Sequence, residues 1–233
     1  MWFCAALLAL SLAYAVMRGT RPAVQGGSDR TDSRTILAFI AGMALATFLV
    51  RIFVPETASV LNMHPGDFPQ YVLMFAAGIA VHRGGWFEHL PQRLAARWAF
   101  ASLLLSLPLL AVLVVSGGAL QHDTTQYSGG FNLVSAGKCL WEALVCVGMS
   151  LGLIALYRQR FNRQGRSAKF LSDNAFAVYL FHPPVIIALA ILLHPVAAPP
   201  LLKAALLTAC AAVVTFALSA LVFRRLPVLN RIL

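Results

Sequence analysis

The sequence predicts an all-α membrane protein, a polytopic bundle of about seven transmembrane helices with its N-terminus outside and its C-terminus in the cytoplasm. Of its 233 residues, 60% are hydrophobic and only 11% are charged, and the mean hydropathy is +0.78. Soluble domains are about half apolar and about a quarter charged. An apolar excess of this size indicates lipid-facing surface, and the apolar residues fall into seven long runs.

These runs approach the roughly 20 residues that a helix needs to cross a bilayer. Together they form one transmembrane domain over residues 1–233, with helices expected at about 2–17, 35–54, 68–82, 98–120, 137–157, 172–193 and 201–223. The run at 98–120 contains no ionisable group and gives the clearest prediction. The run at 68–82 is short, so its assignment as a spanning helix depends on the charge pattern.

The first run also has a feature of a secretory signal peptide, because Ala13, Tyr14 and Ala15 resemble a cleavage site. However, it lacks a basic segment before the apolar stretch, and the positive charge follows at Arg18. This charge order favours a true helix. A first helix that begins at residue 1 with its N-terminus outside is typical of a chain without its upstream helices.

Lysine and arginine are concentrated in alternate gaps between the runs, and the other gaps carry none apart from Arg51 at a helix end. The basic residues of the rich gaps are Arg18, Arg21, Arg30 and Arg34; Arg83, Arg93 and Arg97; Arg158, Arg160, Arg163, Arg166 and Lys169; and Arg224, Arg225 and Arg231. The positive-inside rule places these gaps in the cytoplasm, which requires the run at 68–82 to span. The net charge of +10 therefore reflects membrane orientation, and no nucleic-acid partner is predicted.

His182 lies within the predicted helix at 172–193 and is followed by Pro183 and Pro184. Proline removes a backbone donor, so carbonyls one turn earlier lose their partners and the helix is expected to kink. Ionisable groups in a membrane are costly and are functional candidates by default. Two interpretations of His182 stay open: a group that binds substrate or relays protons, and a buried histidine bonded to a neighbouring helix.

Two carboxylates near the outer face are weaker candidates. Glu142 lies about five residues into the helix expected at 137–157, and the favoured interpretation is an ion pair with Lys138 at i−4. Asp67 lies in an outer loop with turn chemistry, where it and His64 are candidates to face a substrate outside.

The four cysteines all lie in apolar runs and form no C-x-x-C pair. Cys139 and Cys146 are seven residues apart, so they share one helix face. Their favoured interpretation is that of small buried hydrophobic residues, and no metal site is predicted.

Three ordered stretches resemble the membrane acyltransferase-3 family, and the nearest branch looks like the glucan biosynthesis protein C type. They are 66–86, 160–184 and 223–229, and with the helices between them they cover about 36–233. The most specific is the segment from Tyr179 to Pro184, Tyr-Leu-Phe-His-Pro-Pro. Each stretch alone is weak evidence for the family, whereas the three stretches in this order are specific to it.

The resemblance implies a fold of about ten helices in a full-length member, with both termini cytoplasmic. It also implies a bacterial inner-membrane enzyme that moves an acetyl or succinyl group from acyl-CoA to a carbohydrate such as a periplasmic glucan. Acyl-CoA is then a co-substrate, and no permanently bound cofactor is expected. The resemblance implies that His182 and Tyr179 are supporting catalytic groups and that Arg83, Arg160 and Arg163 bind CoA. The predicted acceptor-binding residues are Glu142, Asp67 and Tyr71.

The sequence departs from the family in one respect. Members carry an Arg-x10-His pattern whose histidine is the presumed base, and no histidine of this chain has an arginine eleven residues before it. We therefore expect the base to lie outside this chain, which would be inactive alone. Two rival hypotheses are a proton-coupled transporter and a non-catalytic remnant, and an in-frame upstream extension with three more helices would favour the enzyme.

Overall fold

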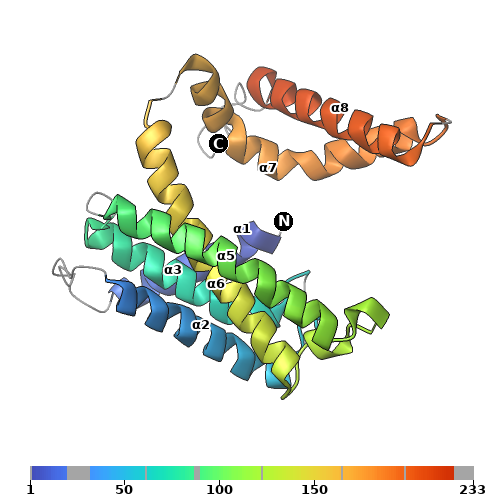
Figure 1. The fold of residues 1–233 in the computed structure, drawn as a ribbon. Coiled ribbons are helices and arrows are strands. Elements are labelled where there is room, and N and C mark those ends of the chain that lie inside the picture. Colours follow the sequence, from blue (N-terminus) through green and yellow to red (C-terminus); the bar gives the residue numbers. More distant parts are fainter. Residues whose placement is uncertain are drawn as a thin grey trace. The chain divides into compact units, whose positions relative to one another are not determined.

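The computed structural model describes residues 2–19, 32–60, 62–86, 90–121, 123–163, 165–196 and 198–222 (Figure 1). Seven α-helices account for most of them, in the order that the sequence predicts, so the all-α fold is confirmed. They are α1 (Trp2–Gly19), α2 (Ser33–Phe53), α3 (Phe68–Arg83), α5 (Gln92–Ser116), α6 (Leu133–Arg160), α7 (Arg166–Leu193) and α8 (Pro200–Leu221).

Five of these helices, α2, α5, α6, α7 and α8, are long and apolar enough to cross a membrane. The other two are shorter, with 18 residues in α1 and 16 in α3. At 1.5 Å per residue α3 is about 24 Å long, which is less than the roughly 30 Å thickness of the hydrocarbon layer. The membrane crossing of α1 and α3, and the orientation of the chain, therefore stay predictions.

Helices α2 and α6 begin earlier than predicted, because a polar residue that lies before the apolar run caps each of them with its side chain. The Asp32 carboxylate accepts a hydrogen bond from Thr35 N at 2.9 Å, so α2 begins at Ser33 instead of 35. This backbone bond, helped by one from the Thr35 hydroxyl, holds the pKa of Asp32 below its ordinary value. Asn132 caps α6 in the same way, accepting from Ser135 N at 2.8 Å, so α6 begins at Leu133 instead of 137.

Three other helix bounds extend at least three residues beyond the sequence prediction, whereas α5 ends at Ser116, four residues before its predicted end at 120. α5 begins at Gln92 instead of 98, α6 continues to Arg160 instead of 157, and α7 begins at Arg166 instead of 172. In each case the added turns carry basic residues, which can extend beyond the hydrocarbon layer. Hydropathy alone therefore places these three helix bounds too far inside the helix. The predicted end of the last helix at 223 and the family-like stretch 223–229 lie outside the described residues.

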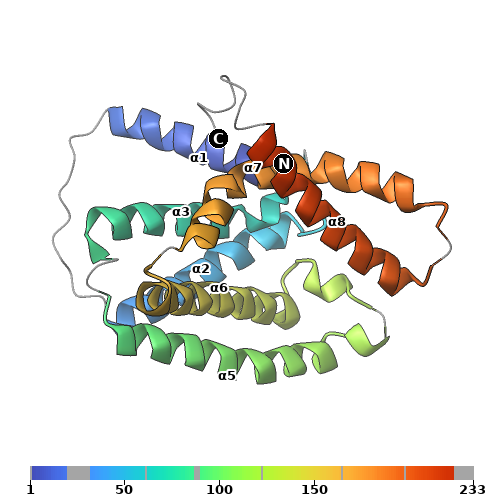
Figure 2. The ribbon, with the colours of Figure 1, turned by 90° about the horizontal axis from the view of Figure 1, so that it is seen from above.

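The chain divides into two compact units, residues 1–162 and 163–233, and each is described by itself. In the first unit α6 packs against both α2 and α5, and α3 packs against α2 (Figure 2). The core at the contact between α2 and α6 is apolar, with Ile40, Met43, Ala143 and Leu151 all at most 7% exposed.

Helices α5 and α6 approach closely because small residues meet at their contact. A Cβ atom added at Gly148 would lie 1.6 Å from Ser102 Oγ, and one added at Gly152 would lie 2.4 Å from Ala99 Cβ. Such small residues, one turn apart on each helix, let membrane helices gain van der Waals contact without a hydrophobic driving force.

The second unit is an antiparallel pair of helices, α7 and α8, that carries a buried hydrogen bond. The Ser219 hydroxyl donates to Asn174 Oδ1 at 2.7 Å, and Asn174 Nδ2 donates to the Phe170 carbonyl at 2.7 Å. Both Asn174 and Ser219 are completely buried. An interhelical bond of this kind stabilises helix pairs in a membrane, where an unpaired amide would have no water to bond.

We expect Gly148→Leu to force α5 and α6 apart, because its side chain would overlap Ser102. A loss of about 3 kcal/mol in the free energy of unfolding is the expected size for an overpacked contact of this kind. The measurement is the thermal unfolding of the purified protein in detergent. The matched control is Gly42→Leu on α2, since a Cβ added there meets nothing within 4 Å. Equal melting temperatures for the two variants would contradict the prediction.

Candidate functional site

The first unit contains a cluster of charged side chains where α2 ends and α3 begins. Arg51, in the last turn of α2, is only 2% exposed. Its Nη2 donates to Asp67 Oδ1 at 2.5 Å and lies 2.8 Å from Glu142 Oε2 on α6. One buried guanidinium therefore joins three segments of the chain; we call these three residues, with the groups bonded to them, the Arg51 cluster.

A second cation extends the cluster along α6. Lys138 Nζ bonds to the Glu56 carboxylate and lies 3.8 Å from Glu142 Oε1. The five charged groups comprise two cations and three carboxylates, so the cluster has a formal charge of −1. Since Asp67 and Glu142 are each 18% exposed, both carboxylates remain partly accessible.

Three neutral side chains complete the cluster. Gln70 Nε2 donates to Glu142 Oε2 at 3.0 Å, and the Tyr71 hydroxyl lies 3.5 Å from Asp67 Oδ2. Arg51 Nη1 lies 3.6 Å from the sulfur of Cys139, which is completely buried. Every guanidinium nitrogen of Arg51 except Nε thus has a partner among the described residues.

The backbone around Arg51 is fixed by loop contacts. Gly130 N donates to the Arg51 carbonyl at 3.0 Å, and Glu56 N donates to the Ser128 carbonyl at 2.7 Å, which ties the loops after α2 and before α6 together. Gly129 has a φ of +150°, and a Cβ there would lie 2.4 Å from the Arg51 carbonyl oxygen. Only glycine fits that position, so the loop closes directly over the end of α2.

The structure brings together three of the acceptor-binding residues that the sequence predicts, Asp67, Tyr71 and Glu142. Glu142 is the tenth residue of α6, about 14 Å from its start, and not the fifth as predicted, because the Asn132 cap lengthens the helix. The expected approach of Lys138 to Glu142 is found, but Arg51 is the closer partner of Glu142.

Sequence reasoning missed Arg51, which it treated as an isolated basic residue at a helix end. The signal that could have found it is its position: it is a single arginine at the end of an apolar run, next to a predicted outer gap that carries no other cation. A cation there needs carboxylate partners, and Asp67 and Glu142 are on that same predicted side.

The second unit contains the predicted catalytic pair, His182 and Tyr179, both on α7. His182 Nδ1 lies 2.8 Å from the Tyr179 carbonyl oxygen, and the two rings are 5.9 Å apart. Pro183 has no N–H for that carbonyl, which it would otherwise bond at i−4. The imidazole therefore replaces the lost backbone bond. A carbonyl only accepts, so Nδ1 carries the proton, and Nε2 of the neutral ring is an acceptor.

The predicted CoA-binding arginines lie on separate segments. Arg83 is in the last turn of α3, the end of that helix remote from Asp67, and its guanidinium carbon lies 5.3 Å from the centre of the Tyr14 ring. Arg160 ends α6, and Arg163 begins the second unit. All three side chains are exposed.

Possible metal ligands can be located only within the part of the chain that the structure describes. It contains no group of three His, Cys, Asp or Glu side chains that could hold a metal ion. Its four cysteines are free thiols.

Comparison with known proteins gives one match. The family model described as an acyltransferase domain, Acyl_transf_3, matches residues 1–224. Curated proteins and solved structures gave no match. The family match includes α1 and α2 and two of the stretches that carry the resemblance in the sequence, 66–86 and 160–184, but only the first two residues of 223–229.

We expect Arg51→Met to lower the free energy of unfolding by about 3–5 kcal/mol, because it leaves Asp67 without its cation and Glu142 with only the more distant Lys138. Arg51→Lys should lose less, since an ammonium keeps the charge but lacks the planar fork that reaches both carboxylates. Thermal unfolding in detergent measures both, with the exposed Arg160→Met as control. A melting temperature for Arg51→Met equal to that of the control would refute the central role of Arg51.

Proposed function

This chain belongs to the acyltransferase-3 family, and from that premise we propose that it moves an acyl group from acyl-CoA to a hydroxyl of a carbohydrate, such as a periplasmic glucan. The family and the apolar helices make it a membrane acyltransferase. The donor, the acceptor and the bacterial inner membrane with a cytoplasmic C-terminus belong to the proposal. The match over residues 1–224 is the observation that carries it.

The reaction sets three requirements. The hydroxyl oxygen attacks the thioester carbonyl, a C–O bond forms, the C–S bond breaks, the CoA thiolate leaves and the hydroxyl proton passes to a base. The transfer thus needs a base near the hydroxyl, hydrogen-bond donors for the developing oxyanion and a cationic site for the CoA phosphates.

The Arg51 cluster is suited to bind the acceptor. Arg51 holds Asp67 by Oδ1, so Oδ2 is directed elsewhere, and its contact with the Tyr71 hydroxyl at 3.5 Å is long. A sugar hydroxyl can donate to Asp67 Oδ2 and so join this carboxylate. On the predicted topology the cluster lies near the outer face, where a periplasmic acceptor would arrive.

His182 and Tyr179 are proposed as positioning groups. The bond from Nδ1 to the Tyr179 carbonyl leaves His182 Nε2 to accept a hydrogen bond from a hydroxyl. The family's base is the histidine of its Arg-x10-His pattern, which this sequence does not contain, so His182 is assigned to orient a substrate hydroxyl and not to deprotonate it.

The donor is proposed to bind at the basic side of the helices. Arg83 and Arg160 are exposed cations at helix ends, and Arg163 is an exposed cation in the segment between α6 and α7. All three are on the predicted cytoplasmic side, where the CoA phosphates would be present. Arg83 is the strongest of the three, because the face of Tyr14 holds its guanidinium in place.

The test is transfer of a labelled acyl group from acyl-CoA to glucans by membrane vesicles. The vesicles contain the chain together with any in-frame sequence encoded upstream of residue 1. We expect transfer by the wild type, and for Asp67→Asn a rise of about tenfold in the KM for the acceptor with little change for the donor, since a hydrogen bond from the sugar to a charged group is lost. The same variant should also lower the melting temperature, because Arg51 loses one of its two carboxylate partners. A control is Asp123→Asn, an exposed loop carboxylate. Sugar or proton flux without acyl transfer would replace the proposal with a transporter.

We expect His182→Asn and His182→Phe to separate the role of the ring nitrogen from the backbone bond. Asparagine can still donate to the Tyr179 carbonyl but has no Nε2, whereas phenylalanine loses both functions. Both variants should lower kcat about 10²-fold, the size expected for a misplaced reactant, while only His182→Phe lowers the melting temperature. Full activity of His182→Asn would reduce His182 to a structural role.

A further inference from the structure

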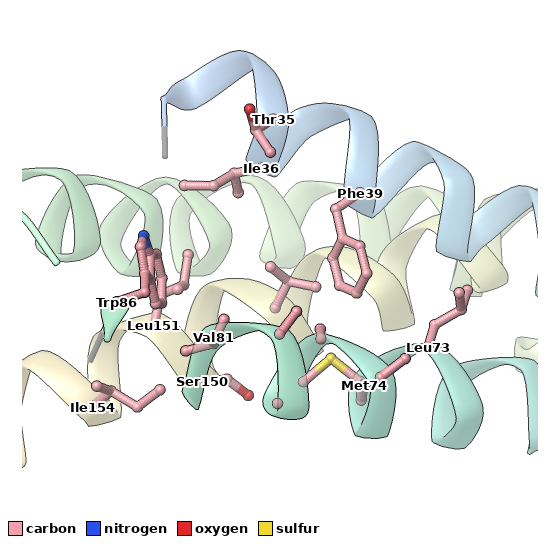
Figure 3. A pocket seen from close by; sticks show the side chains of 15 residues that line it. Thr35, Ile36, Phe39, Leu73, Met74, Val81, Trp86, Ser150, Leu151 and Ile154 are labelled. Carbon is pink, nitrogen blue, oxygen red and sulfur yellow. The ribbon is translucent and has the colours of Figure 1, made fainter. Parts of the chain in front are cut away.

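A cavity of about 520 Å³ lies between α2, α3 and α6. Ile36 and Phe39 extend into it from α2, Leu73 and Met74 from α3, and Leu151 from α6 (Figure 3). The lining is almost entirely hydrocarbon and contains no charged side chain. The cavity belongs to the first unit and contains none of the residues of the Arg51 cluster.

The cavity exists because α3 presents small residues to its neighbours. Ala76, Ala77, Gly78 and Ala80 all line it, and α3 has no buried residue. A Cβ added at Gly78 meets nothing within 4 Å, so the space continues up to the backbone of the helix. Helix α3 thus leaves space between itself and its neighbours, whereas α5 and α6 pack tightly against each other.

One end of the cavity lies where α2 begins and α3 finishes. Thr35 of α2 and Val81 of α3 line the cavity at that end. Arg34 precedes Thr35, and Arg83 follows Val81 by two residues. Both arginines are exposed and lie at helix ends just beyond lining residues, so an apolar pocket and cations occur at the same end of α2 and α3. This combination complements an apolar chain that carries an anionic head group.

We propose that this cavity holds the fatty acyl chain of the acyl-CoA donor, with the CoA phosphates at the rim near Arg34 and Arg83. The inference rests on the proposed function and names its acyl group. An acetyl group would fill little of the space. A succinyl group would bury its carboxylate against hydrocarbon without a cation, which is strongly unfavourable. Burial of a longer chain gains about fourfold in affinity for each methylene taken out of water.

The experiment is photocrosslinking of the purified protein in detergent with palmitoyl-CoA that carries a diazirine on its chain. The expected products are labelled peptides of α2 and α3 that contain Phe39 and Met74. Excess palmitoyl-CoA should abolish the label, whereas acetyl-CoA at the same concentration should compete at least tenfold less well. Equal competition by the two thioesters, or label spread evenly over all helices, would overturn the proposal.

The matched variants are Gly78→Leu, which fills the cavity, and Gly42→Leu, which adds the same side chain to an exposed position on α2. We expect Gly78→Leu to lower palmitoyl-CoA labelling at least tenfold and Gly42→Leu to leave it unchanged. Labelling by a diazirine phosphatidylglycerol that palmitoyl-CoA does not displace would assign the cavity to a bilayer lipid and overturn the proposal.

Binding and transfer distinguish this inference from the proposed function. Specific labelling without acyl transfer to any glucan would retain the acyl-chain site and refute the transferase proposal. Acyl transfer from acetyl-CoA or succinyl-CoA, with no labelling by palmitoyl-CoA, would retain the transferase proposal and refute the acyl-chain site.

Discussion

The buried guanidinium of Arg51 is the interaction on which the arrangement of the first unit depends. Removing a cation from water at membrane depth is costly unless carboxylates accompany it, and Asp67 and Glu142 supply them from two other segments. The end of α2, the start of α3 and the middle of α6 must therefore meet at one point. The loop contacts at Gly129 and Gly130 follow from the same requirement, because they close over the Arg51 carbonyl.

The three helices that Arg51 joins have different surroundings along their length. At one end they hold the polar Arg51 cluster, and towards the other they line an open apolar cavity, beyond which Arg34 and Arg83 lie at the helix ends. An acyl transfer needs sites for two unlike substrates, a hydroxylated acceptor and an amphiphilic donor. The division of α2, α3 and α6 into a polar and an apolar half matches that chemical difference and separates the two proposed binding sites on one scaffold.

The second unit shows how a proline in a membrane helix is accommodated. Pro183 leaves the Tyr179 carbonyl without a donor, and the ring of His182 supplies one from the adjacent residue. Of the two interpretations open for His182, a bond to a neighbouring helix is not the contact found; the bond stays within α7. The sequence predicts a polar residue beside a released carbonyl, but it does not show that one satisfies the other, nor that Nε2 is thereby left as the acceptor.

Hydropathy, charge and motif order in the sequence determined the all-α membrane class, the seven helices in order, the acyltransferase family and the three polar residues near Arg51. Each of these features depends on residues that are close together in the sequence, so it can be inferred without knowing which helices pack together. Only the tertiary structure decided that Arg51 pairs with Asp67 and Glu142 and that α3 leaves a cavity beside Gly78. Both depend on which helix faces meet and how closely, since an ion pair or a void arises between segments and belongs to neither alone.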